Sequence, residues 1–192
     1  MVAENLLEFD VSQNTVPAVI DLQSNDFELF QLTQQADIDI DLLSRRWKEL
    51  QAMTHPDRFS SQGDKAARIA MQYSIRVNEA YKRLKSPLTR FAYLCELHGA
   101  PIDAESNTSM DVEFLSQQMH WREALEDSNS LSDIVVLQNE VDELKVRLSD
   151  NCLNAIDQQC DYASASKIVR SMMFVEKFQH DIDKKIDLLE RS

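Results

Sequence analysis

The sequence predicts an all-α protein made of two helical domains. Its 192 residues include only two glycines, Gly63 and Gly99, and four prolines that stand apart, so tight turns between β-strands have little of the material they need. Long stretches instead repeat apolar residues every three or four positions, which is the spacing of one helix face. With 43% hydrophobic residues, the chain can also bury a real core.

Two amphipathic helices are predicted on either side of Pro56. This proline fixes its own φ and pushes His55 out of the α region, so a helix arriving there must stop. The first helix ends near Thr54, and its apolar face consists of Ile40, Leu43, Trp47 and Leu50. The second runs from about Asp64 to Leu84, and its apolar face consists of Ala66, Ala70, Tyr73, Val77, Ala80 and Leu84. Helices joined by so short a loop pack antiparallel.

The loop between these helices, Met53 to Phe59, carries more chemistry than a plain connection needs. His55, Asp57 and Arg58 place an imidazole, a carboxylate and a guanidinium at the exposed tip of the hairpin. Taken alone, the tripeptide His55-Pro56-Asp57 is more often a helix terminator than a functional loop. Flanking helices in the right phase favour the functional reading.

Positive charge on the first helix of the hairpin lies largely away from its apolar face. It comes from Arg45, Arg46 and Lys48. Without the loop, a docking surface and an ordinary solvated face explain these cations equally well.

A short helix is predicted between Pro87 and Gly99. Ser86 suits the N-cap, Pro87 the first helical position and Gly99 the left-handed position after the C-terminus. Its apolar side consists of Leu88, Phe91, Leu94 and His98. We therefore expect a first domain over residues 24–99, preceded by an irregular extension over residues 1–23 and followed by a linker over residues 100–110.

The remaining chain, residues 111–192, predicts a three-helix bundle. The expected helices span about 111–127, 132–157 and 162–190, the last capped by Asp161. The middle helix offers an apolar seam at Ile134, Leu137, Val141, Leu144 and Leu148. The last helix offers one at Ile168, Met172, Val175, Ile182, Ile186 and Leu189. These seams are expected to pack together.

The first helix of the bundle has more apolar positions than one core face needs. At 100° per residue, Trp121 and Leu125 share one side, while Leu115 and Met119 share a side roughly opposite. Two carboxylates, Glu123 and Asp127, continue the second side. On the last helix Phe174 lies about 110° from the centre of the seam, which predicts an exposed aromatic ring. Together these residues indicate a protein-binding surface; a rotated bundle core explains the periodicity equally well.

Composition narrows the class of partner. The formal net charge is −13 at pH 7, and residues 100–192 hold nineteen acids against nine bases, so nucleic acid would be repelled. Cys95, Cys152 and Cys160 form no close pair, which argues against a disulfide framework or a metal site, and no cofactor is expected. Acids rather than bases follow Met1, and no apolar run approaches bilayer length. We expect a cytoplasmic protein that works with other proteins and not with membranes.

These motifs support a resemblance to a known family. The hairpin with its His55-Pro56-Asp57 loop, opened by Asp26-Phe27-Glu28-Leu29-Phe30-Gln31-Leu32, resembles the J domain of DnaJ-type co-chaperones. Followed by an acidic bundle with Phe114-Leu115 and Arg122-Glu123-Ala124-Leu125, it is similar to the HscB family of iron–sulfur-cluster co-chaperones over residues 24–192.

The resemblance implies two partners. A dedicated DnaK-type ATPase chaperone, HscA-like, would dock on the J domain, whose loop and basic helix would stimulate ATP hydrolysis. An IscU-type scaffold protein would bind the bundle at the positions that match the family: Leu115, Met119, Glu123, Asp127 and Phe174. Departures from the family occur at Met53, Thr54, Ser116 and His120.

Two rival functions find less support in the sequence. An enzyme that uses His55 as base and Asp57 as acid lacks support, because an exposed hairpin tip has no pocket and no nucleophile, phosphate loop or metal cluster accompanies it. A general J-domain co-chaperone for unfolded clients would need a Gly/Phe-rich or cysteine-rich module, and none follows the J-like part.

Overall fold

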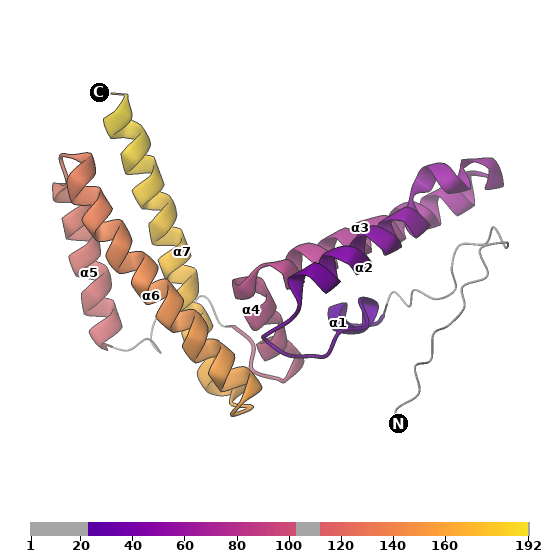
Figure 1. Ribbon diagram of the computed structural model, residues 1–192, viewed down its shortest axis with the longest axis horizontal. Helices are drawn as coiled ribbons and strands as arrows, with labels where there is room; N and C mark the ends of the chain where they lie inside the picture. The colour runs from indigo at the N-terminus through magenta and orange to yellow at the C-terminus, as the bar shows by residue number, and fades with distance from the viewer. Residues whose placement is uncertain (1–22, 103–111, 192) are drawn as a thin grey trace. The chain divides into compact units, whose positions relative to one another are not determined.

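The computed structural model describes residues 23–102 and 112–191, and every regular element in these ranges is helical (Figure 1). This confirms the all-α prediction. The expected N-terminal extension, apart from Gln23, and residues 103–110 of the expected linker lie outside the described residues. The elements are α1 (Asp26–Leu29), α2 (Ile40–Thr54), the 3₁₀ helix η1 (Pro56–Gln62), α3 (Asp64–Lys85), α4 (Pro87–Leu97), α5 (Val112–Asp127), α6 (Leu131–Asp157) and α7 (Tyr162–Glu190).

The described chain forms two compact units. One contains the residues up to Leu32 together with Ile40–Lys82, and the other contains Thr33–Asp39 together with everything from Arg83 onward. The expected domain boundary after Gly99 concerns functional domains, and it stays a prediction. The compact units divide the chain elsewhere, because α4 packs against α6 and α7.

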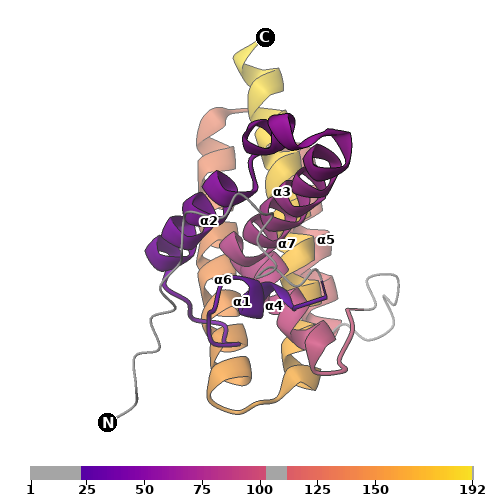
Figure 2. The same ribbon diagram turned by 90° about the vertical axis from the view of Figure 1, so that its right-hand side faces the viewer.

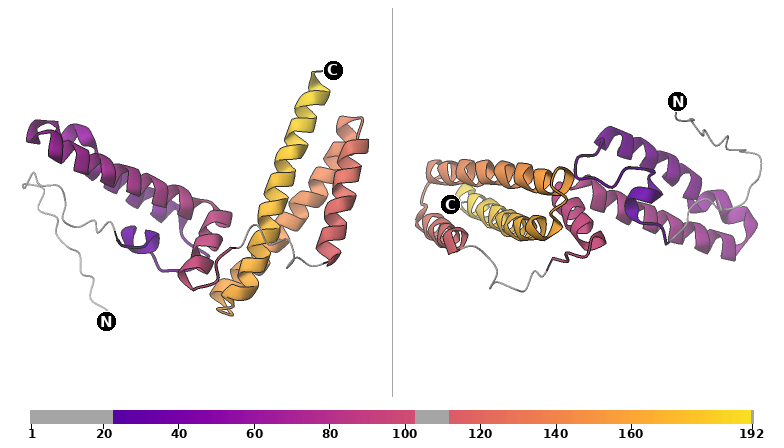
Figure 3. Two further views of the ribbon diagram at one scale, coloured as in Figure 1. Left: turned by 180° about the vertical axis from the view of Figure 1, so that it is seen from behind. Right: turned by 90° about the horizontal axis from the view of Figure 1, so that it is seen from below.

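In the first unit α2 and α3 form the predicted antiparallel hairpin (Figures 1 and 3). The Trp47 indole N–H donates to Asn78 at 3.0 Å, and its ring stacks on Tyr81 with centroids 4.5 Å apart. Ser44, one turn earlier on α2, lies 3.3 Å from the same tyrosine hydroxyl. From Trp47 back to Ser44 on α2, the partner on α3 moves forward from Asn78 to Tyr81. The two helices are therefore antiparallel.

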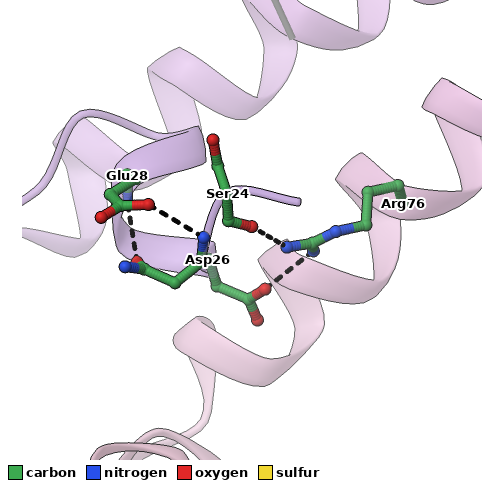
Figure 4. Close-up of polar contacts among 5 residues, drawn as sticks. Ser24, Asp26, Glu28 and Arg76 are labelled. Atoms are coloured by element: carbon green, nitrogen blue, oxygen red, sulfur yellow. Dashed lines mark hydrogen bonds and ion pairs between the residues drawn. The ribbon is translucent and has the colours of Figure 1, made fainter. Parts of the chain in front are cut away.

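Helix α1 is short and depends on its neighbours for stability. Asn25 and Glu28 form a reciprocal capping box, which satisfies two backbone N–H groups of this single turn. The carboxylate of Asp26 is fully buried and lies 2.7 Å from the Arg76 guanidinium on α3. The same guanidinium donates to the Ser24 carbonyl at 2.8 Å (Figure 4). A buried charge needs such a partner, so this pair fastens α1 to the hairpin.

The second unit is the predicted bundle, in which α5, α6 and α7 lie alongside one another (Figure 2). Asp161 caps α7 as expected, accepting the Ser164 N–H at 2.9 Å. The buried core joins all three helices and consists of Trp121, Ile134, Leu137, Val141, Val175, Phe178 and Ile182. The predicted seam of α6 faces this core, and that of α7 does so from Val175 onward, with Phe178 added. At the start of α7 the predicted seam was wrong by one residue, because Val169 is fully buried and Ile168 is half-buried.

Helix α4 completes the core of this second unit. Gly99 has φ +75°, and the Ala100 N–H donates to the Cys95 carbonyl at 2.8 Å, so α4 ends in the predicted left-handed turn. Its buried face includes Phe91 and Leu94, as expected, but not His98. His98 is exposed and stacks on Tyr162 with centroids 3.8 Å apart, whereas Cys95 is fully buried.

Residues 33–39 are tied into the same unit by two polar side chains, one half-buried (Asp157) and one buried (Arg90). The Asp157 carboxylate accepts the backbone N–H groups of Ala36 at 2.6 Å and Asp37 at 2.8 Å. Arg90, only 6% exposed, donates from Nε to the Ala36 carbonyl at 2.8 Å. Burial lowers the pKa of this guanidinium, and the carboxylates of Asp37 and Asp157 oppose that shift. The connection between α1 and α2 is thereby held at the end of α6.

Candidate functional site

The His55-Pro56-Asp57 segment is a 3₁₀ turn rather than an irregular loop. His55 is the N-cap of η1, with extended φ and ψ of −62° and 126°, and Pro56 takes the first position of the turn. A proline fits there because that position has no backbone partner for an N–H. The tight loop expected from the sequence is therefore the regular 3₁₀ helix η1.

The turn exposes its functional groups and buries its flanks. The side chains of His55 and Asp57 are 55% and 89% exposed, while Thr54 and Phe59 on either side are 1% and 4% exposed. The Arg58 guanidinium donates to the Ala52 carbonyl at 2.9 Å, which ties the turn to the last turn of α2. The anchored flanks hold an exposed imidazole and carboxylate in a fixed place.

The geometry also orients the imidazole. The Asp57 N–H donates to His55 Nδ1 at 3.4 Å, and the Asp57 carboxylate lies 3.6 Å from the same nitrogen. Because Nδ1 accepts, the neutral ring carries its proton on Nε2. Both groups are open to solvent, which suits contact with a partner protein better than catalysis in an enclosed pocket.

The three cations on α2 have different environments. Arg45 and Lys48 are exposed and extend the positive charge along the hairpin. Arg46 is half-buried, and its guanidinium donates to the carbonyls of Phe30 and Gln31 at the end of α1. Sequence reasoning placed Arg46 only on the outer face, because the end of α1 cannot be located from periodicity.

On the bundle, α5 has the two sides that its sequence predicts. Trp121 is 2% exposed and stacks on Phe178 with centroids 5.6 Å apart, so its side faces the core. Met119 is 65% exposed, and Glu123 and Asp127 are exposed as well. Leu115 is half-buried.

Phe174 is less exposed than expected. It is half-buried and packs between two aromatic rings, edge-on to Phe114 at 5.8 Å and stacked with Phe178 at 6.2 Å. The prediction of a freely exposed ring was wrong, because α5 lies against this side of α7 and supplies Phe114. One side of Phe174 supports the core, and the ring also borders the surface.

Arg122 connects Phe174 with the outer side of α5. Its guanidinium lies 5.6 Å from the centroid of the Phe174 ring. Seven residues are nearly two full helical turns, so Arg122 and Leu115 share one side of α5. The side that carries Leu115 and Met119 therefore borders α7 at Phe174. The five residues Leu115, Met119, Glu123, Asp127 and Phe174 are called the α5/α7 patch below.

Sequence reasoning did not assign a role to Arg122. A signal was available, because its position seven residues after Leu115 already places it on the outer side of α5. Its contact with α7 depends on how the two helices pack.

Metal and redox chemistry find little support in the described ranges. No group of three or more His, Cys, Asp or Glu residues in residues 23–102 and 112–191 could hold a metal ion. Burial raises the pKa of the Cys95 thiol to about 11 and that of Cys152 to about 12, which keeps both protonated. Among the helices described, none is long and apolar enough to cross a bilayer.

Comparison with known proteins agrees with this arrangement. A family model described as the HSCB C-terminal oligomerisation domain matches residues 110–183. The co-chaperone protein HscB homolog of Bordetella petrii is 40% identical over 157 residues, which cover 81% of this chain and 92% of that protein.

Two solved structures share the fold at 29% sequence identity. Human co-chaperone protein HscB superposes with a TM-score of 0.83 over 86% of this chain and 84% of that one. Chaperone HscB from Vibrio cholerae gives a TM-score of 0.77 over 86% and 99%. With a J domain built on the α2–α3 hairpin, an acidic helical bundle after it and relatives that match along most of their length, the chain belongs to the HscB family of co-chaperones.

Proposed function

We propose that this protein stimulates the ATPase of a dedicated DnaK-type, HscA-like chaperone and delivers an IscU-type scaffold to it during iron–sulfur cluster assembly and transfer. The observation that carries the proposal is the His55-Pro56-Asp57 turn, whose polar groups are exposed while Thr54 and Phe59 anchor it. A turn with only a structural role would not need buried residues on both sides to hold exposed polar groups in place.

The proposed chaperone-binding surface consists of the turn and α2. His55, Asp57 and Arg58 form the tip, and Arg45 and Lys48 supply positive charge on the helix that leads to it. Complementary charge mainly speeds and orients encounter between two proteins. In this role the helix guides docking and the tip makes the contact that triggers hydrolysis. Arg46 contributes by holding α1 in place.

The scaffold end is the α5/α7 patch. Met119 and Leu115 offer apolar area beside Phe174, and Glu123 and Asp127 supply carboxylates at the C-terminal end of α5. Apolar anchors within a polar rim are the usual composition of a protein interface. The protein itself needs no cofactor for this role, because the scaffold carries the cluster, and we place its work in the cytoplasm.

The test measures ATP hydrolysis by the HscA-like chaperone with this protein, with and without the IscU-type scaffold. We expect stimulation by the protein and a further rise when the scaffold is added. The Leu115→Ala/Met119→Ala variant should keep the first effect and lose the second, since each anchor contributes roughly 1 to 3 kcal/mol of binding.

The alternative is a general J-domain co-chaperone that delivers unfolded clients. A denatured protein that replaces the scaffold in the same assay, and competes with it, would favour that function. A further rise in hydrolysis that only the folded scaffold produces would rule it out.

A further inference from the structure

Phe174 has one basic residue against its ring and two more within a helical turn of it, in an otherwise acidic bundle. The Arg122 guanidinium lies over the ring at 5.6 Å. Arg170 precedes Phe174 by four residues and Lys177 follows it by three, so both lie on the same side of α7 within one turn. Three of the nine basic residues in residues 100–192 thus gather at one aromatic side chain. We call Arg122, Arg170 and Lys177 the basic collar.

The collar is not neutralised from within. In the described ranges no ion pair is found for any of its three members, although the bundle holds about twice as many acids as bases. Other lysines of the bundle do have partners. Lys184 lies 3.3 Å from the Asp181 carboxylate, and Lys185 donates to the Glu126 carbonyl at 3.3 Å. Asp181, one turn beyond Lys177, is therefore already engaged.

The position of Arg122 also matters for the aromatic ring. A guanidinium over an aromatic face is attracted to it more strongly when water is excluded. A partner that covers Phe174 would exclude water from this contact, and the guanidinium would then need acceptors for its remaining donors; a carboxylate supplies both the acceptors and the opposite charge. The same reasoning applies to Arg170 and Lys177 at the edge of the covered area.

We propose that the basic collar selects a scaffold segment in which a carboxylate lies next to the apolar side chain that contacts Phe174. This inference rests on the proposed function and adds the chemistry of the matching surface. Glu123 and Asp127 place negative charge on α5, whereas the collar places positive charge beside Phe174. The α5/α7 patch therefore carries negative charge at Glu123 and Asp127 and is bordered by the positive collar at Phe174, and its partner must present the reverse order of charge.

These opposite charges fix the orientation of the bound scaffold. Apolar contacts are non-directional, so Leu115, Met119 and Phe174 alone would tolerate a partner turned around on the surface. A reversed partner would place like charges together at both positions, which costs several kcal/mol at an interface. The charged residues thereby determine the orientation of the bound scaffold, and the apolar residues contribute most of the affinity.

The experiment removes the collar charges and measures scaffold binding by calorimetry at low and high salt. The test variant is Arg170→Gln/Lys177→Gln in the full chain. The matched control is Lys184→Gln/Arg191→Gln, which changes the net charge equally but lies seven and fourteen residues beyond Lys177, toward the C-terminal end of α7 and at its C-cap. We expect the test variant to bind about tenfold more weakly at low salt and the difference to shrink as salt screens the charges. The control should stay within about twofold of the wild type.

A second pair of variants separates charge from packing at Arg122. Arg122→Lys keeps the positive charge and should bind nearly as well as the wild type. Arg122→Met keeps an unbranched apolar stem over Phe174 but removes the charge, and it should lose affinity and salt dependence together. Thermal melts of the Arg122 variants and of the Lys184/Arg191 control should match the wild type, since these are exposed positions. Arg170 is half-buried, so binding by the Arg170→Gln/Lys177→Gln variant is compared at a temperature where its melt shows it to be fully folded.

Three results would overturn the inference. Collar variants that bind like the wild type with unchanged salt dependence, while Leu115→Ala/Met119→Ala still loses binding, would show that the scaffold docks without the collar. Tighter binding after neutralisation would show a basic partner surface. Failure of the wild type to bind the scaffold would remove the proposed function together with this inference.

Discussion

His55 is positioned by backbone and neighbours and makes no contribution to the core. Its Nδ1 accepts the Asp57 N–H at 3.4 Å and its side chain is more than half exposed. A surface substitution usually changes the free energy of unfolding by no more than about 0.5 kcal/mol. Substitutions of His55 can therefore test its function without changing the stability of the protein.

We expect His55→Gln to abolish stimulation of the chaperone ATPase while scaffold binding and the thermal melt stay as in the wild type. Glutamine keeps a polar side chain of similar reach but offers the partner a different arrangement of donor and acceptor. Single-turnover ATP hydrolysis with the chaperone measures the effect. Normal stimulation by this variant would refute the role assigned to the turn.

Asp26 and Arg76 give the opposite case, because their role is structural. Removing one partner of a buried ion pair costs about 3 to 5 kcal/mol, and the lower end applies here because Arg76 is 22% exposed. Arg76→Met should therefore lower the free energy of unfolding by roughly 3 kcal/mol in urea titrations. Adding Asp26→Asn should restore much of the loss, since no buried charge then lacks a partner. An additive loss in the double variant would contradict this account.

The cysteines differ in reactivity for physical reasons that can be measured. Cys95 and Cys152 are buried with raised pKa values, whereas Cys160 is exposed. Only the thiolate reacts with disulfide reagents. The native protein at pH 8 should therefore release one equivalent quickly from a chromogenic disulfide, and the other two only after unfolding. Cys160→Ser should remove the fast phase.

The same shifts give a direction for stability against pH. Folding favours the protonated thiols, so their contribution is complete below pH 9.0, the ordinary thiol pKa, and is lost as pH rises toward 11 to 12. Cys95→Ala/Cys152→Ala should show a smaller fall in stability between pH 9 and 11 than the wild type. An equal fall would assign that pH dependence to other groups.

Helix α5 separates folding from binding on its two sides. Trp121→Ala with Leu125→Ala should destabilise the bundle by several kcal/mol, because one residue is buried and the other packs against the core. Leu115→Ala with Met119→Ala should change the melt far less and weaken scaffold binding instead. Thermal melts and scaffold titrations on both pairs decide the assignment. The reverse result would mean that the two sides are exchanged.

Helix boundaries and caps were readily predicted from local chemistry. Pro87 and Gly99 bracket α4, Asp161 begins α7, and the outer side of α5 follows from period alone. What failed depends on contacts between distant residues. Phe174 is half-buried because Phe114 on another helix lies against it, and Arg46 is engaged because the end of α1 lies beneath it. Periodicity identifies a face and gives no information about what covers it.

The place of α4 is the largest difference from the expected organisation. The sequence places α4 with the preceding hairpin, because a proline and a glycine mark the ends of this helix and a polar stretch follows it. Its fully buried residues Leu94 and Cys95 lie instead in the unit that contains α6 and α7. Only three-dimensional packing could decide between these assignments.

We expect a fragment of residues 1–99 to be poorly soluble and to melt without cooperativity, since the face of α4 that carries Phe91 and Leu94 would be uncovered. A fragment of residues 1–85, which ends with α3, should behave better. Circular dichroism and sedimentation of the two fragments compare them. A well-behaved longer fragment would show that α4 can be covered without the bundle.

The seating of α4 and of residues 33–39 against the bundle limits how such proteins can diversify. A recombination event near residue 100 would join residues 33–39 and α4 from one parent to a bundle from another, so the Asp157 carboxylate would have to fit the Ala36 and Asp37 backbone of a different parent. Hybrids made at the end of α3 would also have to exchange the short connection between α1 and α2. The hairpin and the bundle are therefore expected to be inherited together, and the two partners that we propose for them would be constrained to change in step.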